Sequence, residues 1–275
     1  MVQQLSLTAQ VASPRIERLL LTLETLTGNI CSPMHQHSVI LKPRYPFTPE
    51  PIPGKFIQIE SYRIRMNRIW EKGFPKEFLN KDEKENEADV FGESITKPNP
   101  NVNSSIWTLQ LTDIPAGGKN SVLIQNIYET TIYQTDDVIG YLDELGYMHE
   151  AEFWTDGVRF YYGNVIIELS RLYVLNTKQQ STAPIEIKAD EMVIDPVEDS
   201  ETSKLSLLDP TGTCHVKAYV NVGALNDLES AAIGIKQLES LKKELSEIVE
   251  LHIPDRTAMD SRINSRIASS ASNLK

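Results

Sequence analysis

Three residues of types that can bind transition metals lie close together in the run C-S-P-M-H-Q-H, namely Cys31, His35 and His37. A zinc site needs three or four such ligands at set spacings. The spacing here matches no standard zinc pattern, and no further ligand follows nearby. Cys214 and His215 are adjacent, so their side chains would point to opposite faces of a strand. We therefore interpret the first run as a loop with incidental polar side chains, and we predict neither a metal nor a cofactor.

Two glutamates, Glu150 and Glu152, have the spacing that places both side chains on one face of a strand. Tunnel-shaped phosphohydrolases hold metal ions with such a pair, usually followed by lysine in the pattern Glu-x-Glu-x-Lys. The position of that lysine is taken by Trp154 in this chain. We therefore favour a polar outer face of a sheet for these glutamates. A tunnel-type metal-dependent triphosphatase is the enzyme alternative.

Residues 42–72 form a locally basic stretch, although the whole chain has a net charge of −11. Contacts to phosphate require only clustered cations. However, no aromatic stacking motif accompanies them, and the net charge disfavours a general nucleic-acid binder. We expect pairing with acidic insertions of the chain or with an acidic partner protein, and no direct sequence-specific nucleic-acid contact. The basic residues are Lys42, Arg44, Lys55, Arg63, Arg65, Arg68 and Lys72.

Length and composition narrow the class of protein. The 275 residues suffice for one large domain or two small ones, and the hydrophobic content of 40% is typical of a globular protein. Two cysteines are too few for a disulfide framework, which indicates a reducing compartment. There is no secretory signal and no apolar run of the roughly 18 residues that a membrane span needs. We expect a soluble intracellular protein that does not bind membranes.

The strongest strand pattern covers residues 147–175, where runs rich in aromatic and β-branched residues are separated by Asp156-Gly157 and Gly163-Asn164. Both dipeptides are typical of two-residue hairpin turns. Two such turns predict an antiparallel meander whose apolar row fills the centre of a barrel and whose polar row faces outward. The predicted cross-strand pairs are Phe153 with Phe160, Trp154 with Arg159, Phe160 with Ile167 and Arg159 with Glu168.

Further strands and helices follow from their periodicity. Strands are expected at 2–11, 38–42, 55–70, 107–112, 121–133 and 213–223. Helices are expected from the Ser13-Pro14 cap to Gly28, from the Thr135 cap to Gly146, and from the Asn226 cap to about residue 250. Because strands follow strands, the predicted fold is α+β, mostly β: one large antiparallel sheet closed into a barrel of about eight strands, flanked by about three helices. We expect a single domain over 1–275, with mobile polar insertions at about 71–105 and 176–203 and a flexible tail after about 263.

Several motifs in one order carry a family resemblance. They are the opening MVQQLSL, WTLQLTDIPAGG at 107–118, GVRFYYGNVIIEL at 157–169, VKAYVNV at 216–222, LKKEL at 241–245 and IPDRTAMDSR at 253–262. Together they resemble subunit 18 of the Mediator complex in its budding-yeast form. The similarity covers most of the chain outside the two polar insertions.

The resemblance implies a non-catalytic protein of the nucleus. Proteins of this family fold as an antiparallel barrel with flanking helices, similar to tunnel-type RNA triphosphatases. They pair with a related barrel, Mediator subunit 20, and a C-terminal helix of Mediator subunit 8 tethers the pair to the other head-module subunits. The head module contacts the RNA polymerase II machinery, so the implied role is that of a transcription coactivator. A small-molecule-binding barrel is a third alternative.

The last motif supplies the candidate docking residues. A closed barrel has no free strand edge, so partners should bind helix faces, loops or short added strands. We expect the segment 254–262 to act as a docking site or as a structural clasp, and Asp255 could equally pair with Arg256 inside the chain. The candidates are Pro254, Asp255, Arg256, Met259, Asp260 and Arg262.

Overall fold

The computed structural model describes residues 1–45, 61–70, 106–133, 138–175, 205–223 and 227–263. The polar insertions predicted at 71–105 and 176–203 and the tail after 263 lie outside the described residues. So do the first part of the strand predicted at 55–70 and the helix caps predicted at Thr135 and Asn226. Within the described ranges, no helix is both long and apolar enough to cross a membrane.

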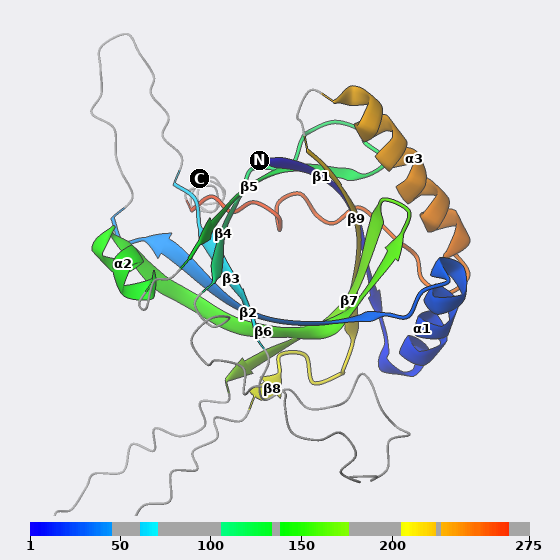
Figure 1. The fold of residues 1–275 in the computed structure, drawn as a ribbon, viewed down its shortest axis with the longest axis horizontal. Coiled ribbons are helices and arrows are strands. Elements are labelled where there is room, and N and C mark those ends of the chain that lie inside the picture. The colour runs from blue at the N-terminus through cyan, green and yellow to red at the C-terminus, as the bar shows by residue number, and fades with distance from the viewer. Residues whose placement is uncertain (46–60, 71–105, 134–137, 176–204, 224–226, 264–275) are drawn as a thin grey trace, which may run out of the picture.

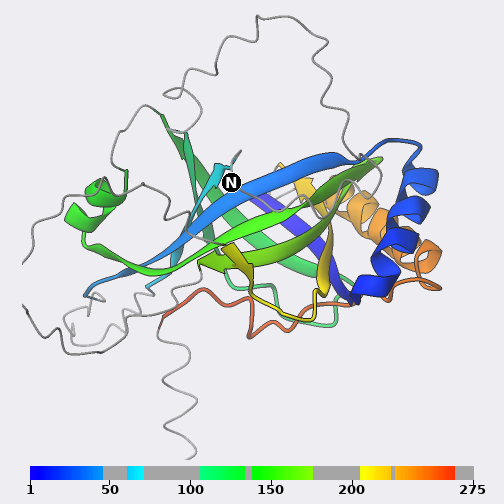
Figure 2. The ribbon, with the colours of Figure 1, turned by 90° about the horizontal axis from the view of Figure 1, so that it is seen from below.

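Eight antiparallel strands close into a barrel, which Figure 1 shows from one end and Figure 2 from the side. Their order around the barrel is β6-β2-β3-β4-β5-β1-β9-β7, and pairing of β6 with β7 closes the ring, while β8 extends β7 outside it. This confirms the predicted barrel with three helices. The strands are β1 (Val2–Val11), β2 (Ser32–Pro43), β3 (Ile64–Ile69), β4 (Trp107–Thr112), β5 (Leu123–Ile132), β6 (Tyr147–Tyr162), β7 (Val165–Leu175), β8 (Leu205–Leu207) and β9 (Cys214–Val222).

The three helices found in the described residues lie outside the barrel wall. They are α1 (Ser13–Thr27), α2 (Val138–Glu144) and α3 (Leu228–Glu244), with α1 and α3 side by side and α2 on the opposite side (Figure 1). Helix α1 ends as predicted at Gly28, whose φ of 67° is the left-handed conformation that glycine adopts readily. Its N-cap is Ala12 without a side-chain hydrogen bond, so the predicted Ser13 cap is wrong.

Helix α3 also differs from its prediction. Its cap is Asp227, whose carboxylate accepts a hydrogen bond from the backbone N–H of Ser230. The helix ends at Glu244 rather than near residue 250. The chain leaves the helix there because Leu245, Val249 and Leu251 turn toward the barrel and are buried in its outer core.

Strand β6 is the main correction to the sequence prediction. It runs without a turn for 16 residues, straight through Asp156 and Gly157. Gly157 lies where strand β7 approaches closely, because a Cβ atom at this position would be 2.0 Å from the carbonyl oxygen of Leu169. The second predicted turn is correct: Gly163 has a φ of 59°, and the pairs across it have the predicted register.

The missing turn inverts the predicted faces of the sheet. Residues 154 and 159 of one continuous strand point to opposite faces, whereas a hairpin would have placed them side by side. Phe160 and Ile167 are fully buried on the outer face, in a cluster that includes residues of α1 and α3. Arg159 and Glu168 therefore point into the barrel, and the predicted apolar centre is wrong.

The hydrophobic core consequently lies between the barrel wall and the helices. Gly234 of α3 comes so close to the wall that a Cβ atom there would lie 2.9 Å from Leu5 and 3.1 Å from Val220. A smaller cluster lies under α2 and includes Met66 and Trp107. Burial of each such side chain contributes about 1.5–3 kcal/mol. The main contacts beneath α1 and α3 involve Leu19, Leu23, Leu238, Leu241, Leu5, Leu7, Val216 and Ala218.

The close approach at Gly157 gives the first prediction. Substitution Gly157→Ala should lower the free energy of unfolding by about 3 kcal/mol or more, because the methyl group overlaps the backbone of β7. Gly223→Ala is the matched control, since a Cβ atom at that position would have nothing within 4 Å and its φ is not in the left-handed region. Urea denaturation of both variants checks the prediction, and equal stability of the two would contradict it.

Candidate functional site: the barrel interior and the C-terminal clasp

A charged cluster occupies the interior of the barrel, centred on Glu168 of β7. Arg159 of β6 donates from Nε and Nη2 to Glu168 Oε1, at 2.9 and 2.6 Å. Tyr219 of β9 donates its hydroxyl to the same oxygen, at 2.9 Å. Burial, and then the negative charge of Glu168, raise the pKa of Tyr219 above its ordinary value. Three neighbouring strands thus converge on one carboxylate.

Two further cations share this interior. Lys217 lies opposite Glu168 in the β7–β9 pairing, with Nζ 5.0 Å from the centre of the Tyr219 ring. Arg65 of β3 lies with its guanidinium 5.2 Å from the centre of the Phe153 ring. Desolvation lowers the pKa of both cations, and the charge of Glu168 partly opposes that effect.

The outer face of β2, β3 and β6 carries a different cluster, built on His37. Its ring stacks on Trp154, with centroids 4.7 Å apart and an angle of 13° between the planes. Arg68 Nε donates to His37 Nδ1 at 2.8 Å, so the ring proton lies on Nε2, which is 2.6 Å from Glu152 Oε1. Burial lowers the pKa of His37 below its ordinary value, while the Glu152 hydrogen bond opposes this shift. Trp70 and Trp107 lie against the same histidine.

The predicted metal-ligand candidates do not come together. Residues 32–37 belong to strand β2, so the expected loop is wrong. His35 Nδ1 is 2.7 Å from the buried carboxylate of Asp156, and His37 contacts Glu152 instead of Cys31. Cys214 lies in the outer core, on the face opposite His215. In the part of the chain that the structure describes, no group of three or more His, Cys, Asp or Glu is placed to hold a metal ion.

The two glutamates of the predicted pair have separate partners. The β2–β6 register shifts between Ile40 and Leu41, and this irregularity leaves Glu150 without a Cα partner on β2. Glu150 accepts a hydrogen bond from Arg63 Nε at 2.6 Å, which lowers the pKa of this carboxyl group. Glu152 contacts His37 on the outer face. The two side chains therefore do not form a joint site.

The basic stretch is dispersed over the barrel. Lys42 and Arg63 both pair with Glu150, and Arg44 pairs with Asp143 of α2. These carboxylates lie outside the two acidic insertions, so these three cations pair within the barrel and with α2. Arg65 faces the interior and Arg68 the aromatic cluster, whereas Lys55 and Lys72 lie outside the described residues.

Residues 250–263, which we call the C-terminal clasp, cross one end of the barrel (Figures 1 and 2). His252 and Thr8 exchange two backbone hydrogen bonds, each 2.8 Å long. Ser261 Oγ donates to the carbonyl oxygen of Thr112 at 2.6 Å, and Ile263 N donates to that of Ser61 at 2.9 Å. The clasp thus ties together β1, the end of β4 and the segment before β3.

The predicted docking residues all lie in this clasp. Asp255 and Arg256 are exposed and do not pair with each other: the Asp255 carboxylate accepts hydrogen bonds from Thr257, and Arg256 Nε donates to the carbonyl oxygen of Pro115 at 2.8 Å. The other candidates are half-buried. The backbone carbonyl oxygen of Met259 accepts a hydrogen bond from the side chain of Gln125, and Arg262 forms an ion pair with Asp260. Pro254 is the first of these candidates along the chain. These contacts attach the segment to the barrel, and its docking role stays a prediction.

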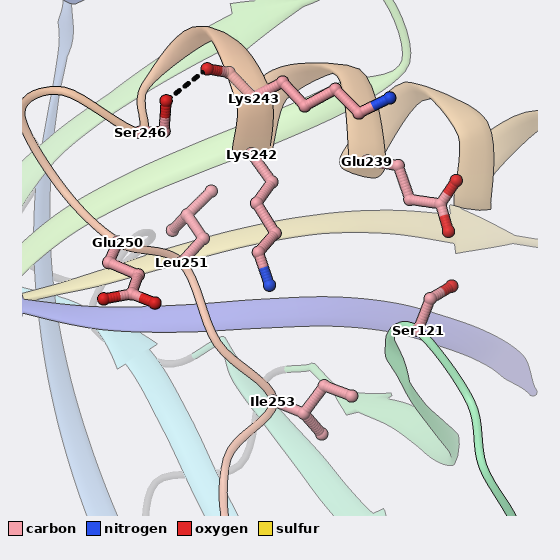
Figure 3. Close-up of a pocket in the computed structure, with 8 residues that line it drawn as sticks. All are labelled: Ser121, Glu239, Lys242, Lys243, Ser246, Glu250, Leu251 and Ile253. Carbon is pink, nitrogen blue, oxygen red and sulfur yellow. Dashed lines mark hydrogen bonds between the residues drawn. The ribbon is translucent and has the colours of Figure 1, made fainter.

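A groove of about 820 Å³ lies between the last turns of α3 and the start of the clasp (Figure 3). Lys242 and Lys243 contribute positive charge, Glu239 and Glu250 contribute negative charge, and Ile253 contributes apolar surface. This mixed lining at an open surface suits a polypeptide segment better than an enclosed small molecule.

The sequence prediction missed Lys217 and Tyr219 as interior residues. Their signal was present in the run V-K-A-Y-V-N-V, where small apolar residues alternate with larger polar ones. The expectation of an apolar barrel centre assigned the apolar residues to the inside. The helices cover those residues instead, and the alternation leaves Lys217 and Tyr219 facing inward.

The fold and these sites define a class: a closed antiparallel barrel with helices on its outer wall and a clasp across one end. The sequence profile of the family described as Med18 protein matches residues 3–262. The chain therefore belongs to the Med18 family, and the resemblance found in the motifs is confirmed.

Relatives and a solved structure agree with this assignment. The Mediator of RNA polymerase II transcription subunit 18 of Yarrowia lipolytica is 29% identical over 262 residues, covering 95% of this chain and 100% of that protein. The protein of the same name from Saccharomyces cerevisiae is 31% identical over 190 residues, which are 66% of this chain and 53% of that protein. A chain of the Schizosaccharomyces pombe Mediator head module shares the fold, with a TM-score of 0.60, 14% identity, and coverage of 92% of this chain and 98% of that chain.

The clasp gives a prediction about stability. Arg256→Ala should lower the free energy of unfolding by about 1–2 kcal/mol, because it removes a charge-assisted hydrogen bond to Pro115. Lys236→Ala, on the exposed side of α3, should change it by less than about 0.5 kcal/mol. Thermal and urea unfolding measure both changes. A loss no larger in Arg256→Ala than in the control would show that this contact does not hold the clasp.

The His37 cluster gives a prediction about pH. The pKa of His37 is lower in the folded state than in the unfolded state, so the unfolded chain binds the proton first as the pH falls below about 6.5. The contribution of neutral His37 to the free energy of unfolding is therefore fully present above that pH. It is lost as the pH falls toward 5, with a slope of at most about 1.4 kcal/mol per pH unit per group. His215 has a pKa shifted in the same direction, so it adds to the slope.

Substitution His37→Gln tests this contribution, because glutamine keeps a hydrogen-bonding side chain but does not titrate. The unfolding free energy of the variant should fall less steeply between pH 7 and pH 5 than that of the unsubstituted protein. His149→Gln is the control, since His149 is exposed. An unchanged slope in His37→Gln would exclude His37 as a source of the pH dependence.

Proposed function

We propose that this chain is a non-catalytic subunit of the head module of Mediator, the coactivator that links regulators to RNA polymerase II initiation in the nucleus. The observation that carries the proposal is the family match over residues 3–262. It is supported by relatives named Mediator subunit 18 that align along nearly their whole length. Such a subunit acts through the surfaces it offers to other proteins.

Exposed apolar side chains support a role in protein contacts. Ile139 and Tyr141 of α2 are 43% and 50% exposed, and Leu145, directly after the helix, is 56% exposed. The other face of α2 covers the smaller core cluster. Ile69, at the end of β3, is 73% exposed. Apolar surface that gathers on one element of a protein with a complete core is typical of interaction sites.

The proposed partners are Mediator subunit 20, as a heterodimer, and the C-terminal helix of Mediator subunit 8. Contacts with the other head-module subunits and with the RNA polymerase II machinery would follow from that assembly. The exposed carboxylate of Asp255 and guanidinium of Arg256 are the clasp groups we propose for partner contact. Both side chains are exposed, although Arg256 also donates Nε to the carbonyl oxygen of Pro115.

A tunnel-type phosphohydrolase is disfavoured by the partners of the two candidate carboxylates. Glu150 is bound by Arg63 and Lys42, and Glu152 contacts His37 on the outer wall. A carboxylate held by cations of the protein is a poor ligand for a divalent ion. Triphosphate hydrolysis that requires Mg²⁺ and disappears in Glu152→Gln would contradict the non-catalytic proposal.

Co-expression with subunit 20 and the subunit 8 helix tests the proposal directly. The three chains should elute together in size-exclusion chromatography, at the mass of a 1:1:1 complex. Failure of this chain to co-elute with either partner would overturn the proposed role as a subunit of this complex.

A charge-reversal variant tests whether the clasp, rather than another part of the surface, contacts a partner. Asp255→Lys should weaken the complex at least tenfold if Asp255 contacts a partner, while Glu229→Lys on α3 is the matched control. Circular dichroism confirms that both variants fold. Equal affinity of the two variants would assign the clasp a structural role only.

A further inference from the structure

The ring of eight strands is closed, yet β6 is longer than the pairing that closes it. Strand β6 begins at Tyr147, whereas its pairing with β7 begins at Trp154, which lies opposite Tyr173. Beyond that pair β7 continues beside β8, and Figure 1 shows β6 and β7 separating. Residues 147–153 therefore pair with β2 on one side and with none of the described strands on the other. We call this unpaired side of residues 147–153 the β6 edge.

Main-chain atoms are exposed along the β6 edge. Ala151 is an exposed residue, although it lies well inside the strand. Glu150 is also exposed, while its side chain, held by Arg63 and Lys42, is only 26% exposed, so much of its exposed surface is backbone. An open strand edge presents N–H and C=O groups in a row, and such a row is a template for pairing with another extended chain.

Exposed apolar side chains lie at both ends of the β6 edge. Leu145 and Met148 are exposed where the chain passes from α2 into β6. Leu172 and Leu175 are exposed where β7 leaves β6, and the exposed Leu208 donates its backbone N–H to the carbonyl oxygen of Leu172 at 2.8 Å. Free main-chain groups between apolar side chains suit a strand that carries apolar side chains of its own.

The carboxylates of this stretch are already engaged within the chain. Glu150 forms ion pairs with Arg63 and Lys42, and Glu152 Oε1 lies 2.6 Å from Nε2 of His37. Neither carboxylate therefore requires a charged partner from another molecule. An uncharged segment suits the β6 edge better than a basic or an acidic one.

A second copy of this chain is a poor occupant of the edge. Two β6 edges related by a twofold axis would pair antiparallel. With the axis at Glu150 this residue would face its own copy, and with the axis at Ala151 it would face Glu152 of the copy. Like charges directly opposite each other destabilise a strand pair, and the net charge of −11 adds a general repulsion between copies.

We propose that the β6 edge is a strand-addition site for an extended, uncharged segment of another protein, with apolar side chains at alternate positions. The added strand would form main-chain hydrogen bonds with residues 147–153. Its apolar side chains would cover Met148 and the exposed leucines at the end of β7. The site goes beyond the proposed Mediator role and is tested on this chain alone, so either proposal can fail without the other.

An NMR titration of the full chain with an acetylated and amidated peptide, T-V-T-V-T-V-T, tests the site. This peptide is uncharged, and its β-branched residues favour an extended strand. It should bind with a Kd below about 1 mM and shift the amide signals of residues 147–153 most strongly. The same peptide with every amide nitrogen methylated keeps the side chains but lacks backbone donors, so it should not bind.

A pair of variants locates the binding. Met148→Lys places a charge beside the edge and should weaken binding roughly fivefold or more. Ile233→Lys, which replaces an exposed apolar residue of α3, is the matched control and should bind as the unsubstituted protein does. If Met148→Lys fails to fold, Leu208→Lys is judged by the same titration.

Four outcomes would overturn the proposal. They are the absence of binding, equal binding by the methylated peptide, equal affinity of Met148→Lys and Ile233→Lys, and signal shifts concentrated elsewhere, for example at the groove of Figure 3. Sedimentation of the chain without peptide examines the remaining occupant. A dimer in which the amides of residues 147–153 are protected from hydrogen exchange would assign the edge to a second copy instead.

Discussion

Alternation along the unbroken strand β6 determines the environment of much of the barrel wall. Its even-numbered residues from Trp154 to Phe160 face outward, and its odd-numbered residues face the interior. The neighbouring strands inherit this assignment through their register with β6, so the apolar side chains meet the helices and the charged ones meet one another. The helices are therefore required to cover the hydrophobic core, because the wall alone would leave it in water.

The sequence predicts the positions of the strands and helices better than it predicts which side of each strand faces the helices. Strands β1, β4 and β9, the helix that ends at Gly28 and the register across Gly163 follow from local periodicity and turn chemistry. The Asp156-Gly157 pair misleads because its role depends on distant residues. His35 contacts the buried aspartate, and the backbone at Leu169 requires the glycine. Such contacts are invisible to a pattern that considers neighbours in sequence.

The candidate sites are likewise predicted only in part, because register follows from local sequence whereas the buried face depends on the whole fold. The Arg159–Glu168 pair is predicted by cross-strand register, but its position inside the barrel depends on which face the helices cover. Lys217 and Tyr219 are missed for that reason. The clasp residues came from the family resemblance, and what the structure adds is their attachment to β1, β4 and β5. Partner binding involves other chains, so periodicity within this one cannot specify it.

The arrangement of β1 has a consequence for synthesis on the ribosome. This first strand pairs along most of its length with β9, residue 3 opposite residue 222, and Thr8 also bonds to His252. Both partners are made roughly 200 residues or more after β1, so one edge of β1 waits on the order of ten seconds or more for them. During that interval the nascent chain exposes an apolar strand that is prone to mispair with other chains. Protection of that edge, by chaperones or by early packing of α1, is thus part of making this barrel.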